Sequence, residues 1–232
     1  MHNPPELFTP SASRPSLDLL HFERRSWQSG YSHVAGIDEA GRGPLAGPVV
    51  AAAVMFDPQF LEQERDQMFK GLTDSKKLSA TQRDYFFDLL DTCPHVQIGI
   101  GQANVTEIDR INILQATYQA FTRAVNSLET LPEQTLIDGN PVQGLPCPSV
   151  SIVKGDSKSL SIAAASIIAK VTRDRIMIEL DKEYPNYGFA RHKGYGTKMH
   201  LEALDRYGPI SHHRKSFRPV SEAKRFAYRS SS

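Results

Sequence analysis

Four acidic side chains follow short apolar runs and stand next to glycine-containing turns: Asp38, Glu39, Asp138 and Asp156. In α/β folds, residues at strand ends collect at one edge of the sheet, where ligands bind. Carboxylates gathered there without a basic partner repel one another, at about 4 Å by several kcal/mol in a partly shielded site. Such a cluster therefore predicts a hard divalent cation, Mg²⁺ or Mn²⁺, as its ligand.

The chemistry that fits such a site is phosphoryl transfer. Two cations about 3.5–4 Å apart stabilise both the attacking and the leaving oxygen of an in-line displacement. Because adjacent side chains of a strand point to opposite faces, we expect Asp38 to be the bridging ligand and Glu39 the less direct one. Taken singly, each Asp beside a Gly could instead cap a turn, which is its commoner role.

Apolar patterning predicts the elements that position these carboxylates. Strands are expected at 34–38, 49–56, 96–101, 134–137 and 150–153, the first two forming an antiparallel pair. Helices are expected at 78–90, with Ser79 as N-cap, and at 106–128, 159–183 and 197–207. These elements define an α/β fold with a mixed central sheet flanked by helices.

The chain divides into three parts by composition and charge. Residues 1–33 are a Pro-rich extension, predicted to be partly disordered, and 34–190 form the expected catalytic domain. The net charge of +1 hides an excess of +7 in residues 191–232, which carry ten Lys and Arg, interleaved aromatics and a predicted helix. Such a stretch indicates either nucleic-acid binding or a solvated basic tail.

Composition excludes several classes of protein. No apolar run approaches the roughly 20 residues that span a bilayer, so we expect no membrane association. The hydrophobic fraction of 40% is ordinary, which excludes a disordered or fibrous chain. Two cysteines are too few for a disulfide framework, so a reducing cytoplasm is expected. Nothing in the sequence indicates an obligate dimer, and we expect a monomer.

Longer motifs surround the acidic residues in unbroken order. Segment 34–50 has the sequence VAGIDEAGRGPLAGPVV, and 164–174 has AASIIAKVTRD. Further segments are 74–78, 112–117, 136–140, 154–157, 192–195 and 212–217. Together they closely resemble bacterial ribonuclease HII, over about residues 34–220. Asp at position 156 favours type HII over the related type HIII, which carries Glu, and the N-terminal extension is too short for the additional domain of type HIII.

The resemblance implies a ribonuclease-H-like fold with an acidic tetrad formed by Asp38, Glu39, Asp138 and Asp156. It also implies an endonuclease that requires Mn²⁺ or Mg²⁺ and acts on RNA–DNA hybrids and on DNA duplexes containing ribonucleotides. Cleavage on the 5′ side of the ribonucleotide would leave 3′-hydroxyl and 5′-phosphate ends, in ribonucleotide removal and RNA primer removal.

The resemblance also implies residues that recognise the substrate. The turn Gly41, Arg42 and Gly43 would read the 2′-hydroxyl, the group that distinguishes RNA from DNA, and Tyr195 would stack near the junction sugar. Basic side chains for the phosphate backbone are expected at Lys76, Lys77 and Arg214, with His213 and Lys215 beside it. Each could instead be a solvated surface residue. Asn112 and Thr117 lie on one predicted helix, and we expect no site role for them.

Two alternatives stay open at this point. One is a non-catalytic nucleic-acid-binding module that uses the basic C-terminal region, although four carboxylates next to phosphates would weaken binding. The other is a metal-dependent nuclease or recombinase of the same fold without selectivity for ribose.

Overall fold

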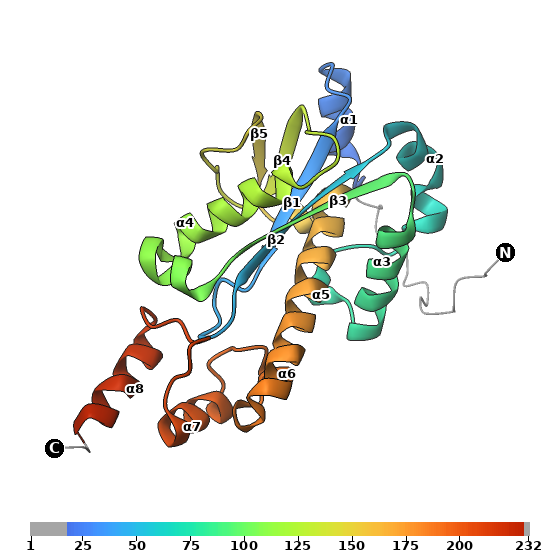
Figure 1. The fold of residues 1–232 in the computed structure, drawn as a ribbon. Coiled ribbons are helices and arrows are strands. Elements are labelled where there is room, and N and C mark those ends of the chain that lie inside the picture. Colours follow the sequence, from blue (N-terminus) through green and yellow to red (C-terminus); the bar gives the residue numbers. More distant parts are fainter. Residues whose placement is uncertain (1–17, 230–232) are drawn as a thin grey trace.

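A five-stranded mixed sheet forms the centre of the molecule (Figure 1), and the computed structural model describes residues 18–229, with side chains up to Ala223. The strand order is β3-β2-β1-β4-β5. Strands β1 (Val34–Ala40), β2 (Val49–Phe56) and β3 (Val96–Ala103) are antiparallel neighbours. Strands β4 (Gln134–Asp138) and β5 (Ser149–Ile152) run parallel to β1. The predicted α/β fold with a mixed sheet is therefore confirmed.

Helices cover both faces of the sheet. Helix α4 (Val105–Asn126) packs on β2 and β3, and α5 (Leu160–Glu183) crosses β1 and β2 on the other face (Figure 1). Helix α3 (Ala80–Thr92) packs beside α5 and begins with the expected N-cap at Ser79. Side chains alternate along the strands, so Ile37 lies in the core under α4 and Ala52 in the core under α5.

Close contact between α5 and β1 depends on small residues. A side chain at Gly36 would overlap the backbone of Ser161, so only glycine allows this approach. Helix α5 is consequently buried on nearly all sides over its first ten residues. The rigid packing fixes the position of every side chain that α5 directs towards the end of β1.

The N-terminal region contributes to the body of the protein. Helix α1 (His21–Gln28) buries Glu23, which accepts hydrogen bonds from Ser159 Oγ (2.6 Å), Ser161 Oγ (2.7 Å) and Ser161 N (3.0 Å). A carboxylate at the first turn of α5 also interacts favourably with the helix dipole. The extension 1–33, predicted to be partly disordered, therefore includes a docked helix, and its residues 1–17 lie outside the described residues.

The C-terminal part continues the same unit. Helices α6 (Phe189–His192), α7 (Lys198–Tyr207) and α8 (Arg218–Arg229) lie at the end of the sheet far from α1 (Figure 1). A bridge between Ala46 and His213 joins this part to the β1–β2 loop. The boundary expected at residue 191 falls inside α6, which packs on α5, so the described C-terminal part continues directly from the domain.

Two helices differ from the prediction. Asn112 interrupts α4 with φ 68°, and its side-chain Oδ1 accepts hydrogen bonds from Leu114 N (2.9 Å) and Gln115 N (3.1 Å). The single helix expected at 106–128 is therefore two segments, the second capped by Asn112. Helix α2 (Pro58–Met68), capped by Asp57, was not predicted because it buries little apolar surface. Three-residue 3₁₀ helices occur at Ser75–Lys77, Gly155–Ser157 and Pro185–Tyr187.

Among the described residues, no helix is both long and apolar enough to cross a membrane.

Candidate active site

Three of the four predicted carboxylates stand on the neighbouring strands β1 and β4. Strands β1 and β4 are parallel with Ile37 opposite Ile137, so Asp38 and Asp138 follow at the same edge of the sheet. Asp38 is buried and lies on the face covered by α5, opposite Ala52 of β2. Its Oδ1 accepts a hydrogen bond from Glu39 N at 2.7 Å.

The fourth carboxylate comes from the turn after β5. Lys154 adopts φ 59° and reverses the chain, which places Asp156 in the 3₁₀ helix Gly155–Ser157. Gly155 N donates to Asp138 Oδ1 at 2.6 Å and ties this turn to the end of β4. As a result, one carboxylate oxygen of each of Asp38, Asp138 and Asp156 lies within 4.8 Å of the other two.

Burial and mutual repulsion oppose ionisation of this cluster. The pKa of Asp38 is raised well above its ordinary value, first by burial and then by the charges of Glu39 and Asp138. The pKa of Asp156 is raised by burial and by Asp138 and Asp74. Carboxylates held together against their own repulsion form a preorganised site for a cation.

Glu39 lies beside the cluster. Its side chain forms an ion pair with Arg42 Nη1 at 3.3 Å, and it is not one of the three carboxylates that converge. Burial raises the pKa of Glu39, although Arg42 acts in the opposite direction. This arrangement follows from the alternation of side chains along β1, as the sequence indicated.

A hollow of 320 Å³ opens beside Asp38 and joins most of the predicted site. Seven of the predicted residues line this hollow, together with five residues that were not predicted. The lining residues are Asp38, Glu39, Ala40, Gly41, Arg42, Gly43, Ser75, Lys76, Ser166, Lys170, Arg173 and Tyr195. The structure thus brings the acidic residues, the glycine turn and the tyrosine into one place.

The two predicted lysines occupy different positions. Lys76 Nζ lies 3.7 Å from Asp156 Oδ2, and its pKa is raised because the attraction of Asp38, Asp74 and Asp156 outweighs the effect of partial burial. Lys77 is exposed and does not line the hollow. Of the two, only Lys76 is placed to meet a phosphate next to the carboxylates.

Two buried arginines hold the turn that follows β1. Arg214 donates to the carbonyls of Gly41 (2.6 Å), Arg42 (2.9 Å) and Gly47 (3.0 Å and 2.9 Å). Arg173 donates to Ala46, Pro48 and Lys193. Neither guanidinium forms an ion pair with a carboxylate among the described residues, and burial lowers the pKa of Arg214 to about 9 and of Arg173 to about 10.

The expectation that Arg214 contacts the phosphate backbone is therefore corrected. Its side chain is fully buried, and its donors are directed at backbone carbonyls, so it positions the turn. His213 is equally buried, whereas Lys215 is exposed. Gly41 adopts φ +98°, and a side chain there would overlap the Arg173 guanidinium, which explains why this position requires glycine.

Tyr195 faces the glycine turn from the C-terminal part. It is 46% exposed, and a Cβ built on Gly43 would lie 3.6 Å from Tyr195 Cε1. An exposed aromatic ring next to bare backbone is a surface on which a sugar or base can stack.

Sequence reasoning missed the residues that α5 contributes. Ser166 Oγ accepts a hydrogen bond from Ser75 N (3.0 Å), and Lys170 Nζ forms an ion pair with Asp174 at 2.8 Å. With Arg173, these side chains recur at helical spacing and interrupt an apolar run. That periodicity was the available signal, because polar residues at positions i, i+4 and i+7 lie on one helix face.

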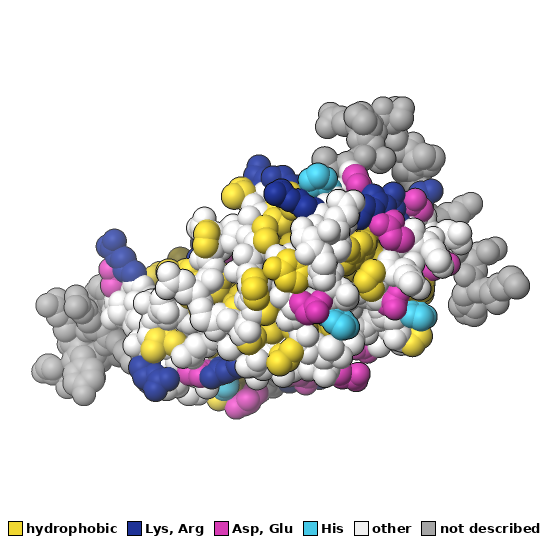
Figure 2. Space-filling view, turned by 90° about the horizontal axis from the view of Figure 1, so that it is seen from above, with side chains coloured by type: hydrophobic (Ala, Val, Ile, Leu, Met, Phe, Trp, Pro, Cys, Tyr) yellow, Lys and Arg dark blue, Asp and Glu magenta, His cyan; other side chains and the backbone are white. Residues whose placement is uncertain are grey.

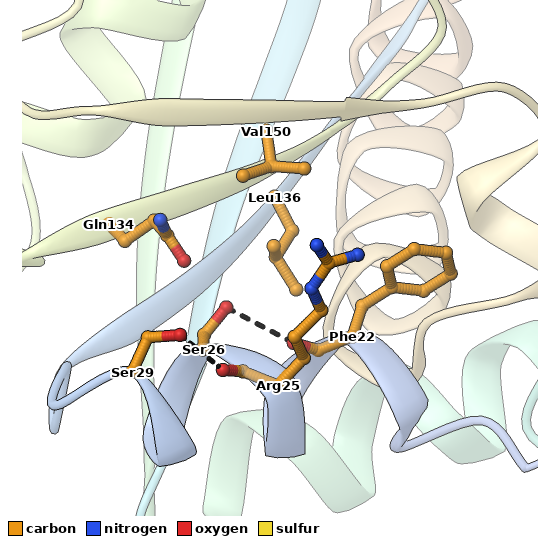
Figure 3. A pocket seen from close by; sticks show the side chains of 7 residues that line it. All are labelled: Phe22, Arg25, Ser26, Ser29, Gln134, Leu136 and Val150. Atoms are coloured by element: carbon orange, nitrogen blue, oxygen red, sulfur yellow. Dashed lines mark hydrogen bonds between the residues drawn. The ribbon is translucent and has the colours of Figure 1, made fainter.

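A second hollow, of 270 Å³, lies at the other end of the sheet between α1, β4 and β5 (Figure 3). Its hydroxyl groups are engaged within α1, since Ser26 donates to Phe22 O at 3.1 Å and Ser29 donates to Arg25 O at 2.9 Å. The face around this end shows basic and acidic side chains interspersed around hydrophobic ones (Figure 2). Such a surface is unlike the single-sign surface expected for a polyanion.

The carboxylate site fits a hard divalent cation. It offers oxygen ligands from three buried or half-buried carboxylates, with no sulfur or imidazole donor among them. Fold and site together match the class of metal-dependent hydrolases, in which carboxylates at the strand ends of a mixed sheet can hold the cation.

Comparison with known proteins gives the family. The family model for ribonuclease HII matches residues 35–220. Ribonuclease HII of Chlamydia trachomatis is 52% identical over 204 residues, which cover 87% of this chain and 89% of that protein. The chain belongs to the ribonuclease HII family, and it is a ribonuclease H, an endonuclease of the class that acts on RNA–DNA hybrids.

Solved structures show the same fold. The ribonuclease H2 of Pyrococcus horikoshii matches with a TM-score of 0.67 and 30% identity, covering 84% of this chain and 99% of that one. A Bst ribonuclease HIII in complex with Mn²⁺ matches with a TM-score of 0.67 and 20% identity, over 95% of this chain and 76% of that one. The predicted ribonuclease-H-like fold is confirmed.

Proposed function

We propose that this ribonuclease H hydrolyses the phosphodiester bond on the 5′ side of ribonucleotides, in RNA–DNA hybrids and at single ribonucleotides embedded in duplex DNA. The products would carry 3′-hydroxyl and 5′-phosphate ends. This activity would serve ribonucleotide removal from DNA and RNA primer removal, by a monomer in the cytoplasm.

One observation carries the proposal. Three carboxylates converge within 4.8 Å, and one of them, Asp38, lines a hollow that the turn 41–43 and Tyr195 also line. A phosphate next to the carboxylates would therefore have its neighbouring sugar against the glycine turn. The reaction centre and the surface that recognises the sugar would then be continuous.

The acidic residues would hold the metal ions. Asp38, Asp138 and Asp156 would act as ligands, with Glu39 adjacent to them, and the ions would be Mg²⁺ or Mn²⁺, two per site. When bound, such ions supply an activated water and neutralise charge on the phosphate. Burial and mutual repulsion raise the pKa values of Asp38 and Asp156, and a bound cation would favour their ionised forms.

Other residues of the chain would orient the substrate. Lys76 lies 3.7 Å from Asp156 and would place a positive charge on the phosphate side of the hollow. Arg42 is half exposed and could exchange its ion pair with Glu39 for a phosphate. Lys77 is proposed to contact the duplex outside the hollow.

The glycine turn would recognise the ribose. Because Arg214 and Arg173 bind carbonyls of residues 41–48 on the buried side, the turn keeps a fixed backbone shape next to the sugar. Backbone groups in this turn would meet the 2′-hydroxyl, while the Tyr195 ring would stack on the sugar of the following nucleotide. Residues 34–190 would thus form the catalytic domain, and 191–232 would complete the substrate groove.

The test is incubation of a labelled DNA duplex containing one ribonucleotide with the purified protein and Mg²⁺ or Mn²⁺. An all-DNA duplex and a sample with EDTA are the controls. We expect one cut 5′ to the ribonucleotide and none in either control. Cutting of the all-DNA duplex would contradict sugar selectivity, and salt-sensitive binding without any cut would favour a non-catalytic module.

A further inference from the structure

Three buried histidines pack against the segment 193–197, which carries Tyr195 and is called the Tyr195 loop below. His192, His200 and His213 belong to α6, α7 and the segment after α7. The rings of His192 and His200 are stacked with centroids 4.6 Å apart, and His200 Nε2 lies 3.0 Å from His213 Nε2. The proposed function assigns no task to this cluster.

Hydrogen bonds at the two ends of the His200–His213 pair fix which nitrogens carry hydrogen. Ile210 N, which can only donate, lies 3.0 Å from His213 Nδ1, so His213 must carry its hydrogen on Nε2. The carbonyl of Tyr195, which can only accept, lies 3.0 Å from His200 Nδ1, so His200 carries its hydrogen there and leaves Nε2 bare. Both ends therefore require His213 Nε2–H to donate to His200 Nε2.

This relay needs two neutral rings. Burial lowers the pKa of His200 to about 4, and burial together with His200 lowers the pKa of His213 to about 3. Both rings are uncharged near pH 7, and each has one donor and one acceptor. The chain from Ile210 N–H to the Tyr195 carbonyl is thus complete, with every ring nitrogen satisfied.

Three consecutive backbone carbonyls of the Tyr195 loop accept hydrogen bonds. Lys193 O accepts from Arg173 Nη1 (3.0 Å), and Gly194 O accepts from Leu45 N (2.8 Å). Tyr195 O accepts from Thr197 N (2.8 Å) as well as from His200. The first two bonds connect the loop to Arg173 of α5 and to Leu45 in the β1–β2 connection. The His200 bond connects it to α7.

We propose that His200 and His213 are positioning residues for sugar recognition: their hydrogen-bond relay holds the Tyr195 backbone so that its ring stays over the turn at Gly43. The inference rests on the proposed role of Tyr195 in recognising the junction sugar. Within the relay, His200 Nδ1–H makes the bond to the Tyr195 carbonyl, and the buried His213 keeps the hydrogen of His200 on Nδ1, so an amide nitrogen in the place of Nδ1 does not need His213. A shift of the ring of about 1 Å is enough to cost a large factor in rate.

The experiment separates the two ends of His200. In His200→Asn the amide nitrogen replaces Nδ1, which keeps the bond to Tyr195 O and loses His213. In His200→Gln the amide oxygen takes the place of Nε2. This variant keeps the hydrogen bond from His213 and loses the bond to Tyr195 O. Tyr187→Phe is the matched control. Tyr187 packs beside His213, and the substitution removes the hydrogen bond from its hydroxyl to Gly208 O (2.6 Å).

The readout is the ratio of kcat/KM on a duplex with one ribonucleotide to kcat/KM on a uniform RNA–DNA hybrid. We expect His200→Gln to lower this ratio by roughly tenfold, and His200→Asn and Tyr187→Phe to leave it within about twofold, at similar losses of Tm. In a Tyr195→Ala background, His200→Gln should cause no further loss.

Several results would overturn the inference. Equal ratios for His200→Gln and His200→Asn, or additive losses with Tyr195→Ala, would show that the histidines only stabilise the fold. An unchanged ratio in Tyr195→Ala would refute the role of Tyr195 and, with it, the relay. A lower ratio in Tyr195→Ala together with an unchanged ratio in His200→Gln would refute the relay alone.

NMR of ¹⁵N-labelled wild-type protein tests the relay without activity. We expect hydrogen on His200 Nδ1 and on His213 Nε2, unchanged between pH 6 and 8. The opposite tautomers, or titration of either ring in that range, would contradict the proposal.

Discussion

Two clusters of buried charge lie side by side in this protein, and they are built in opposite ways. Asp38, Asp138 and Asp156 converge with few hydrogen-bond donors between them. Arg173 and Arg214 are as deeply buried but direct their donors at backbone carbonyls. The acidic cluster lacks positive charge that a cation could supply, whereas the basic cluster is hydrogen-bonded without a counterion.

The difference separates two tasks. In the proposed function, cations that bind to the acidic cluster would release the repulsion within it, so the cost of assembling the cluster would support the reaction. Arg173, Arg214 and the buried histidines bond to the backbone of the neighbouring turn and of Tyr195, and they would support recognition in the proposed function. Substitutions in the two clusters should therefore have opposite effects on stability.

The largest expected effect is that of Asp38→Asn. Loss of a central metal ligand should reduce cleavage by about a thousandfold or more, since metal catalysis contributes several kcal/mol. Removing a buried, repelled charge should also raise the Tm of the metal-free protein by about 2–8 °C. Cleavage of the ribonucleotide duplex and thermal unfolding in EDTA measure both effects. Retained activity would contradict the ligand assignment.

Arg214→Met should act in the opposite direction. It leaves the carbonyls of Gly41, Arg42 and Gly47 without their donor, at a cost of about 3 kcal/mol, or about 6–12 °C in Tm. Thermal unfolding of this variant and of Lys215→Met, an exposed neighbour, provides the comparison. Equal Tm values for the two would mean that the buried guanidinium does not support the turn.

A smaller effect concerns pH. Because the pKa of Asp38 is raised in the folded protein, chiefly by burial and then by Glu39, folding takes up a proton at this group. The resulting destabilisation is present above the folded pKa and vanishes as pH falls below the unfolded value. The Tm advantage of Asp38→Asn over metal-free wild type should therefore shrink as pH is lowered from 8 towards 4. An advantage that grows on acidification would contradict this sign.

The smallest effect is expected at the phosphate contact. Lys76→Met should raise KM by a few-fold and reduce the salt slope of duplex binding by about one. Lys77→Met is the matched control, because Lys77 is exposed and outside the hollow. Binding titrations at several salt concentrations distinguish the two lysines, and an identical response of both would argue against a special role for Lys76.

The fold and the acidic centre were predictable because they depend on local patterns. Short apolar runs located every strand, and the strand ends located Asp38 and Asp138. The buried roles of Arg214 and His213 were not predictable from the sequence. The partners of Arg214 are carbonyls of residues 41–47, distant in sequence, and those of His213 are the Ile210 N–H and the His200 ring, which meet it only in the folded chain. A basic residue in a basic segment looks the same in sequence whether it faces phosphate or backbone. Asn112 likewise breaks a helix whose apolar periodicity continues on both sides.

The most direct test of the central claim is Mn²⁺ binding to the EDTA-treated protein, measured by titration calorimetry and by electron paramagnetic resonance. The account predicts binding by the wild type with a rise in Tm, strong weakening in Asp38→Asn and Asp138→Asn, and unchanged binding in Lys77→Met. Equal Mn²⁺ affinity of wild type and Asp38→Asn would contradict it, because the buried carboxylates would then not be the metal site.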